Sequence, residues 1–122
     1  MGNAQEPKLS PIEKIKSESR QLRGTIKDSL AASTTHFSKD DNALLKSHGS
    51  YEQDDRDKRQ QLLKEKKEPA YSIMVRSKIV GGRMTAEQYL VHDELATRYG
   101  NNTLRITTRQ GLQFHGVLKE NL

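Results

Sequence analysis

The sequence contains no cysteine and no tryptophan, and these absences exclude several kinds of site before any motif is considered. Without thiols the chain can form no disulfide, no thiolate metal site and no iron–sulfur cluster held by its own cysteines. With only two Phe and four Tyr, it offers few aromatic side chains on which nucleic acid bases could stack. No apolar run approaches the ~20 residues needed to cross a bilayer, and the first residues contain no apolar signal segment. Together these features favour a cytoplasmic protein that binds neither nucleic acid nor membranes.

Charge is what the chain has in abundance. Its 122 residues include 21 Lys and Arg against 16 Asp and Glu, a net charge of +5, and only 32% of the residues are apolar. This length suits one small domain with a modest core. The cations are spread along the chain, which favours an anionic ligand over a nucleic-acid groove with its concentrated basic patch.

The most informative segment is Thr103 to Gly116, which reads TLRITTRQGLQFHG. Successive side chains of a β-strand point to opposite faces. One extended ribbon would place its polar odd positions on one face (Arg105, Thr107, Arg109, Gln113 and His115) and its mainly apolar even positions on the other (Leu104, Ile106, Leu112 and Phe114). Gly111 would supply a bend that keeps the two halves in phase. Such a donor face suits a ligand with several carboxylates, because Arg pairs with carboxylates through two charge-assisted hydrogen bonds. A solvated outer face of an amphipathic strand is the alternative.

The segments around this ribbon predict an α+β fold. Before residue 70 we expect a tail at 1–10 and a helical, charged extension at 11–69. That extension comprises a helix at 11–30, a helix from Ser38 to about His48, and a solvated helix or linker from Tyr51 to Pro69. Its low apolar content predicts no core of its own and few long-range contacts for the helix at 11–30.

After residue 70 the order is strand, helix, strand. Residues 71–79 alternate between apolar and polar, which is typical of a strand. Thr85 and Gln88 form a capping box for a helix that ends near Tyr99. The ribbon follows, so that residues 70–122 form one β-α-β half-domain that is incomplete on its own and needs further strands. The even positions of the ribbon should pack on the helix.

Four ordered stretches resemble the N-terminal part of the haemoproteins in the sirohaem-dependent sulfite and nitrite reductase family. They read ESRQLRGTI (18–26), HGSYEQDDRD (48–57), MVRSKIVGG (74–82) and TLRITTRQGLQFHGVL (103–118). The resemblance covers residues 12–122 and implies an N-terminal extension followed by the first nitrite/sulfite reductase ferredoxin-like half-domain.

The resemblance also implies an activity and two cofactors. Family members reduce sulfite to sulfide in a six-electron reaction, on a sirohaem coupled through a cysteine thiolate to a [4Fe–4S] cluster. The cluster cysteines lie outside the sequence that this chain matches, so the 122 residues alone are expected to be inactive. The implied partners are sulfite, the remainder of the haemoprotein, and an electron donor that is either an NADPH-flavoprotein subunit or ferredoxin.

Residue roles carry over from the family position by position. Sirohaem carries eight carboxylates, and the family's contacts to it match Arg105, Thr107, Arg109, Gln113 and His115. Arg76 matches the arginine that approaches both the macrocycle and the bound sulfite, so it is the catalytic candidate. Lys78 shares its strand face and joins it in substrate binding. The chain departs from its relatives at Val80, where many have proline, and at Gly111, where they usually have threonine.

No residue set predicts a protein metal site. We interpret His115 as a hydrogen-bond donor, and the spacings of His36, His48 and His92 match no common metal site. The acids Asp54, Asp55 and Asp57 are expected to pair with nearby arginines or to cap a helix. Two other functions remain open: a sirohaem nitrite reductase fragment, or a non-catalytic remnant that binds an anion or a tetrapyrrole.

Overall fold

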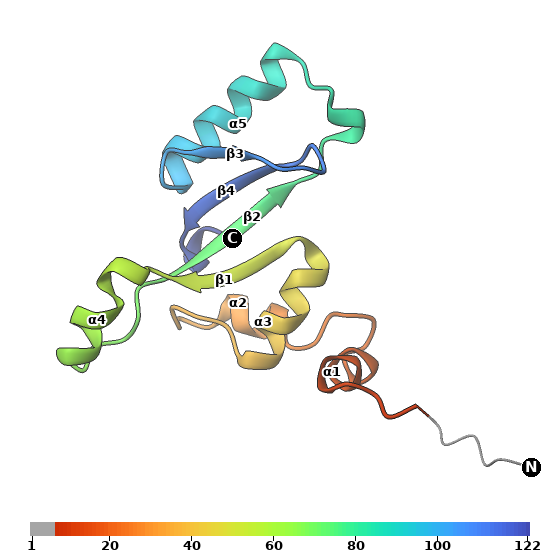
Figure 1. The fold of residues 1–122 in the computed structure, drawn as a ribbon, viewed down its shortest axis with the longest axis vertical. Helices are drawn as coiled ribbons and strands as arrows, with labels where there is room; N and C mark the ends of the chain where they lie inside the picture. Colours follow the sequence, from red (N-terminus) through yellow and green to blue (C-terminus); the bar gives the residue numbers. More distant parts are fainter. Residues whose placement is uncertain (1–6) are drawn as a thin grey trace, which may run out of the picture.

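The computed structural model describes residues 7–122, and a four-stranded antiparallel sheet forms its centre (Figure 1). The spatial order of the strands is β1-β2-β4-β3. Their bounds are β1 (Ser50–Asp54), β2 (Tyr71–Ser77), β3 (Leu104–Ile106) and β4 (Leu112–Val117). The α+β class predicted from the sequence is confirmed.

Five α-helices and three short 3-10 helices surround this sheet in the described part of the chain. In Figure 1, α2 and α3 lie beside β1, α5 lies beside β3 and β4, and α4 projects at the left. The bounds are α1 (Pro11–Glu18), α2 (Ile26–Ala31), α3 (Lys39–Leu45), η1 (Lys46–His48), α4 (Arg56–Lys64), η2 (Val80–Gly82), α5 (Ala86–Tyr99) and η3 (Lys119–Asn121). None of the described helices is long and apolar enough to cross a membrane.

Local capping signals fix the start of α5 as predicted. The Thr85 hydroxyl accepts from the Gln88 N–H, and the Gln88 side chain accepts from the Thr85 N–H. Ser10 likewise caps α1 and Ser38 caps α3. The expected tail at residues 1–10 lies mostly outside the described residues, and Pro7 to Leu9 precede the first cap without regular structure.

The helix expected over residues 11–30 is divided into α1 and α2, and the break lies next to Gly24, where a glycine inside the helical pattern already indicated a possible interruption. Arg20, Gln21 and Leu22 all have positive φ values, of 52°, 63° and 66°. Gly24 follows with φ +50°, and a Cβ there would lie 2.5 Å from Leu44 Cδ1. The break therefore lets the chain pass directly over α3.

The extended ribbon predicted for residues 103–116 is wrong, because the chain folds into a hairpin. Strands β3 and β4 pair antiparallel, with Arg105 opposite Gln113. The turn between them is closed by Thr107, whose N–H donates to the Gly111 carbonyl at 2.9 Å. Gln110 adopts φ +65° to complete the reversal. The face assignment of Arg105 and Gln113 survives, because directly opposite residues of an antiparallel pair point to the same face.

Strand β1 lies inside the segment expected to be a solvated helix or linker. It pairs with β2, placing Tyr51 opposite Met74 and Gln53 opposite Ser72. Only the later part of that segment, α4, is helical as expected. The half-domain at 70–122 was expected to require further strands, and β1 supplies one of them by pairing with β2.

The hydrophobic core draws on residues from both sides of position 70. Phe37 and Leu45 from the N-terminal part pack in one cluster with sheet and helix residues (Ile73, Ala96, Phe114 and Val117). Within the described chain, residues 7–69 thus build no separate core, as predicted. The even ribbon positions pack on α5 only in part, because Ile106 is 84% exposed.

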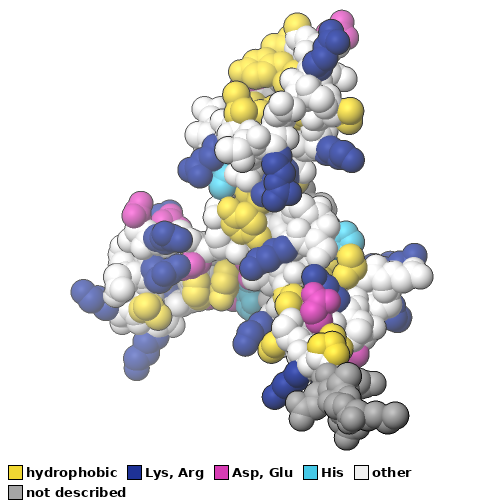
Figure 2. All heavy atoms as spheres, turned by 45° about the vertical axis from the view of Figure 1, so that its right-hand side comes forward, with side chains coloured by type: hydrophobic (Ala, Val, Ile, Leu, Met, Phe, Trp, Pro, Cys, Tyr) yellow, Lys and Arg dark blue, Asp and Glu magenta, His cyan; other side chains and the backbone are white. Residues whose placement is uncertain are grey.

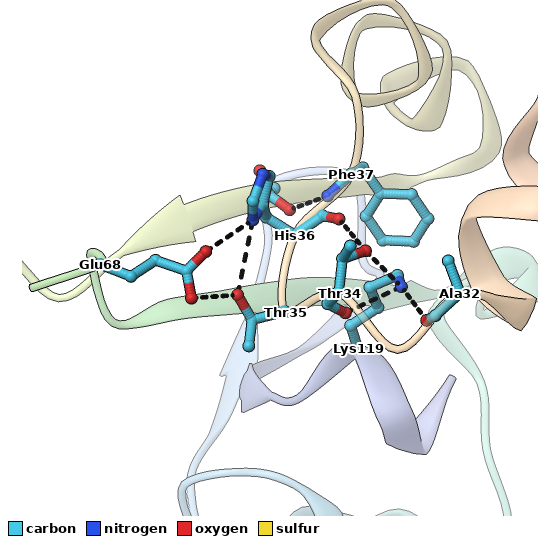
Figure 3. Close-up of polar contacts among 8 residues, drawn as sticks. Ala32, Thr34, Thr35, His36, Phe37, Glu68 and Lys119 are labelled. Atoms are coloured by element: carbon cyan, nitrogen blue, oxygen red, sulfur yellow. Dashed lines mark hydrogen bonds and ion pairs between the residues drawn. The ribbon is translucent and has the colours of Figure 1, made fainter.

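The N-terminal part makes long-range polar contacts through the loop before α3, which lies outside the helix at 11–30 for which few such contacts were predicted. Figure 3 shows that the loop before α3 forms hydrogen bonds with three residues distant in the sequence, Glu52, Glu68 and Lys119. The Glu68 carboxylate accepts from the Thr35 hydroxyl at 2.7 Å and lies 3.1 Å from His36 Nδ1. Glu52 accepts from the Phe37 N–H at 2.7 Å, and Lys119 donates to carbonyls of the same loop.

Candidate functional site

A pocket of about 780 Å³ opens between the end of β2, the β3–β4 turn and the residues before β1. Three cationic side chains line it, those of Arg76, Lys78 and Arg109, while no Asp or Glu among the described residues does so. We call it the basic pocket. Elsewhere the cations are scattered over the surface, as the dark blue side chains in Figure 2 show. The basic pocket is therefore a local concentration of positive charge, and none of its described lining residues is acidic.

The strand register explains how the pocket's floor is built. Arg76 of β2 lies opposite Gln113 of β4, and Gln113 lies opposite Arg105 of β3. Because opposite residues share a face, these side chains form one row of cation, amide and cation. Arg76 and Gln113 line the basic pocket, whereas Arg105, on the far strand, does not.

The turn at 107–111 supplies the second wall. The Thr107 hydroxyl accepts from the Gly111 N–H and donates to the Gly111 carbonyl, both at 3.1 Å. Arg109 is exposed and lies within this turn. A Cβ on Gly111 would lie 3.0 Å from the Ser77 carbonyl, so glycine allows the turn to approach β2 closely. Thr107 thus holds the turn that presents Arg109.

His115 lies behind the pocket. It is buried, at 6% exposure, and its ring contacts Gln53 on one side and Gln113 on the other. Burial, and then the charge of Arg105, lower the pKa of His115. The ring is therefore neutral near pH 7 and adds no charge to the site.

The structure thus brings five of the seven predicted site residues to one cavity: Arg76, Lys78, Thr107, Arg109 and Gln113. Arg105 and His115 lie on the adjoining sheet face but do not line that cavity. Sequence reasoning missed His48 and Gly49, which line it. It also missed Gln53, which is connected to the cavity by hydrogen bonds through His115 and then Gln113. Only the HGSYEQDDRD motif pointed to these three residues, and it indicated a structural role for His48 and no role for the other two.

The donor set fits an organic polyanion. Guanidinium and ammonium groups, an amide and a threonine hydroxyl are hydrogen-bond donors for carboxylates and oxyanions. Among residues 7–122 no group of three or more His, Asp or Glu side chains is placed to hold a metal ion. The basic pocket therefore suits a ligand that carries several carboxylates or other oxyanions.

Comparisons with known proteins agree with this chemistry. Residues 64–122 match the nitrite/sulfite reductase ferredoxin-like half domain. The whole chain is 51% identical to a sulfite reductase (NADPH) haemoprotein beta-component from Staphylococcus haemolyticus and 53% identical to one from Bacillus licheniformis. A third, from Xanthomonas oryzae, is 54% identical over 91% of the chain. The chain spans only 20–22% of the length of these relatives.

Proposed function

We propose, from the premise that this chain belongs to the sulfite and nitrite reductase haemoprotein family, that it is the N-terminal portion of an assimilatory sulfite reductase haemoprotein. The haemoprotein would reduce sulfite to sulfide in a six-electron reaction. The observation that carries the proposal is the basic pocket, in which three cations converge without a carboxylate among the described lining residues.

The pocket would hold sirohaem by its carboxylates. Arg109 would bind a carboxylate from the turn, and Gln113 would donate from the sheet, with Thr107 fixing the turn between them. Arg105 remains a predicted contact of the same cofactor at the edge of this surface. His115 was predicted as a further contact, but both of its ring nitrogens lie within hydrogen-bond distance of Gln53 and Gln113. Sirohaem, when bound, supplies the iron and the delocalised ring on which sulfite is reduced.

Arg76 and Lys78 would face the substrate. Arg76 lies near the end of β2, Lys78 directly follows that strand, and both line the basic pocket. A sulfite dianion there would accept charge-assisted hydrogen bonds from the guanidinium, and the same contact would stabilise charge that builds up during reduction. Arg76 is the residue to which we assign the catalytic role.

The remaining parts of the machinery would come from outside this chain. A [4Fe–4S] cluster needs cysteine thiolates, and the chain has none, so the rest of the haemoprotein would supply them. The electron donor would be an NADPH-flavoprotein subunit, because the relatives are named as NADPH enzymes; ferredoxin is the alternative.

The test is production of the complete haemoprotein with sirohaem supplied, followed by its absorption spectrum and sulfite-dependent electron uptake. The proposal expects haem absorbance that copurifies with the protein and consumption of electrons when sulfite is added. A protein without haem absorbance would overturn the cofactor assignment. Haem absorbance without turnover would leave a non-catalytic tetrapyrrole-binding protein, and preferential turnover of nitrite would reassign the substrate.

A further inference from the structure

A chain of hydrogen bonds runs from β1 to the basic pocket through a buried histidine. Gln53 Nε2 lies 3.3 Å from His115 Nδ1, and His115 Nε2 lies 3.1 Å from Gln113 Oε1. The three residues come from two strands, because Gln53 belongs to β1 while Gln113 and His115 belong to β4. Of the three, only Gln113 lines the pocket.

The orientations of the Gln53 and Gln113 amides in the structure set the direction of both hydrogen bonds. An amide nitrogen carries hydrogens and can only donate, so His115 Nδ1 accepts from Gln53 and holds no proton. A neutral imidazole then carries its one proton on Nε2. That N–H donates to Gln113 Oε1.

These hydrogen bonds determine which group of the Gln113 amide is left free at the pocket. With its oxygen engaged by His115, Gln113 has its NH₂ group left over, and among the described residues this group has no hydrogen-bond partner. Gln113 lines the same cavity as Arg76 and Arg109. A donor, and not a carbonyl oxygen, is therefore available to an anion there.

We propose that Gln53 and His115 are positioning residues, which fix the histidine tautomer and thereby hold the Gln113 amide with its NH₂ group toward an anionic ligand. The proposal rests on the proposed function, because the ligand used to test it is sirohaem. Neither residue needs to touch the ligand for this role.

The surroundings of His115 favour the neutral ring that this arrangement needs. Arg105, on β3, lies opposite Gln113, and Arg76, on β2, lies on the other side of Gln113. Both carry positive charge, and burial, followed by the charge of Arg105, lowers the pKa of the ring. The neighbour from β1 is the uncharged Gln53.

Without Gln53, the two tautomers would be nearly equivalent. The ring could then carry its proton on Nδ1 and accept at Nε2, and the Gln113 amide would turn over to donate to it. The carbonyl oxygen of Gln113 would then face the ligand, where it would repel a carboxylate. Loss of one hydrogen bond of this kind weakens binding about three- to tenfold.

The test uses the complete haemoprotein labelled with ¹³C and ¹⁵N in histidine. In the apo protein we expect an Nε2–H signal that disappears in His115→Phe, and a mixture of tautomers in Gln53→Leu. Sirohaem affinity should fall about three- to tenfold in Gln53→Leu. Gln61→Leu is the matched control, since Gln61 is an exposed glutamine on α4 whose side chain donates to Glu65, and it should change neither quantity.

A double-mutant cycle separates positioning from simple support of the fold. In a Gln113→Leu background, Gln53→Leu should cause no further loss of sirohaem affinity, because its effect passes through Gln113. Additive losses, or an Nδ1–H tautomer in the wild type, would overturn the proposal. If wild-type protein bound no sirohaem, the proposed function would fall, while the tautomer would still decide the orientation of Gln113.

Discussion

Arg76 lies directly opposite Gln113 across the β2–β4 pair, and both side chains line the basic pocket. This pairing places a cation beside a neutral donor on one face of the sheet. Arg109, by contrast, sits in a turn outside the sheet. Backbone segments in paired strands are held more rigidly than those in exposed turns. We therefore expect the arginine on the strand and the arginine in the turn to have different roles.

Replacing these two arginines in the complete haemoprotein should separate substrate binding from cofactor binding. Arg76→Ala should lower sulfite turnover on the order of ten- to a hundredfold, since a charge-assisted hydrogen bond contributes about 1.5–3 kcal/mol, while sirohaem content changes little. Arg109→Ala should lower sirohaem content first. Haem absorbance per protein and sulfite-dependent electron consumption measure the two effects. Equal losses of both quantities in Arg76→Ala would mean that this arginine holds the cofactor.

The crossing of the Gly24 backbone over α3 leads to a prediction for stability. Gly24 has φ +50°, and an added Cβ would lie 2.5 Å from Leu44 Cδ1 and 2.8 Å from Asp41 Oδ1. Gly81 has a similar φ of +62°, but no atom lies within 4 Å of its added Cβ. Gly81→Ala should therefore cost only the backbone strain, about 1 kcal/mol.

Gly24→Ala should cost that strain plus the displacement of Leu44, which is buried. Overpacking of this kind adds about 1–3 kcal/mol. Urea unfolding of the two variants compares the midpoints directly. If both variants lost the same stability, the close approach of Gly24 to α3 would make no separate contribution to the cost of the substitution.

Asp41 forms a buried polar connection between α2 and α3. Its carboxylate accepts from the Thr25 N–H, the Thr25 hydroxyl and the Ser29 hydroxyl at 2.6–2.9 Å. Burial alone would raise the pKa of Asp41, but the hydrogen bonds from Ser29 and Thr25 outweigh it and hold this pKa below its usual value. The ionised form is thus the one that the fold stabilises.

A lowered pKa in the folded state means stability that is present above the unfolded-state pKa of about 3.9 and lost as the pH falls through the folded-state value. Asp41→Asn should therefore cost about 1.5–3 kcal/mol at pH 7, and the penalty should shrink in acid. Asp40→Asn, at an exposed position in the same helical turn, is the control. Urea midpoints at pH 7 and pH 3 measure both. A penalty independent of pH would show that the charge of Asp41 is not what the hydrogen bonds stabilise.

The elements that the sequence predicted well are those whose signals are local. The Thr85–Gln88 capping box and the Ser38 cap specify where their helices begin, because donor and acceptor lie within one turn of each other. The turn at 107–111 carries no Asn-Gly or Asp-Gly pair, which is the strongest short hairpin signal. The ribbon therefore looked continuous, although its alternation still gave the correct face for Arg105 and Gln113.

The elements that were missed depend on distant partners. Strand β1 has charged or amide side chains at three of its five positions, and only its pairing with β2 makes it a strand. The left-handed residues at 20–22 likewise lie beside distant partners, because the Leu22 carbonyl is 2.8 Å from His48 Nε2 and Gly24 directly after them crosses α3. The roles of Gln53 and His48 follow from β1 and η1 meeting the other strands, so no pattern within their own motif could assign them.

Lys119 connects the C-terminal end of the sheet to the loop before α3, and this contact yields the last prediction. The side chain is 5% exposed. Its ammonium group donates to the carbonyls of Ala32 and Thr34 at 2.8 and 2.9 Å, and to the Thr34 hydroxyl at 3.1 Å (Figure 3). The same nitrogen lies 5.7 Å from the centre of the Phe37 ring, within range of a cation–π interaction.

Lys119→Met keeps most of the side-chain volume and removes all these donors. Two backbone carbonyls of the loop then lose their partner, and the expected loss is about 1–3 kcal/mol in the free energy of unfolding. Lys64→Met, at an exposed position in α4, should lie within about 0.5 kcal/mol of wild type. Because the loop is tied at Lys119, amide hydrogen exchange at residues 32–37 should also accelerate more than exchange in α5. Unchanged exchange in that loop, with any loss spread evenly over the protein, would mean that Lys119 supports the sheet and not the attachment of the N-terminal part.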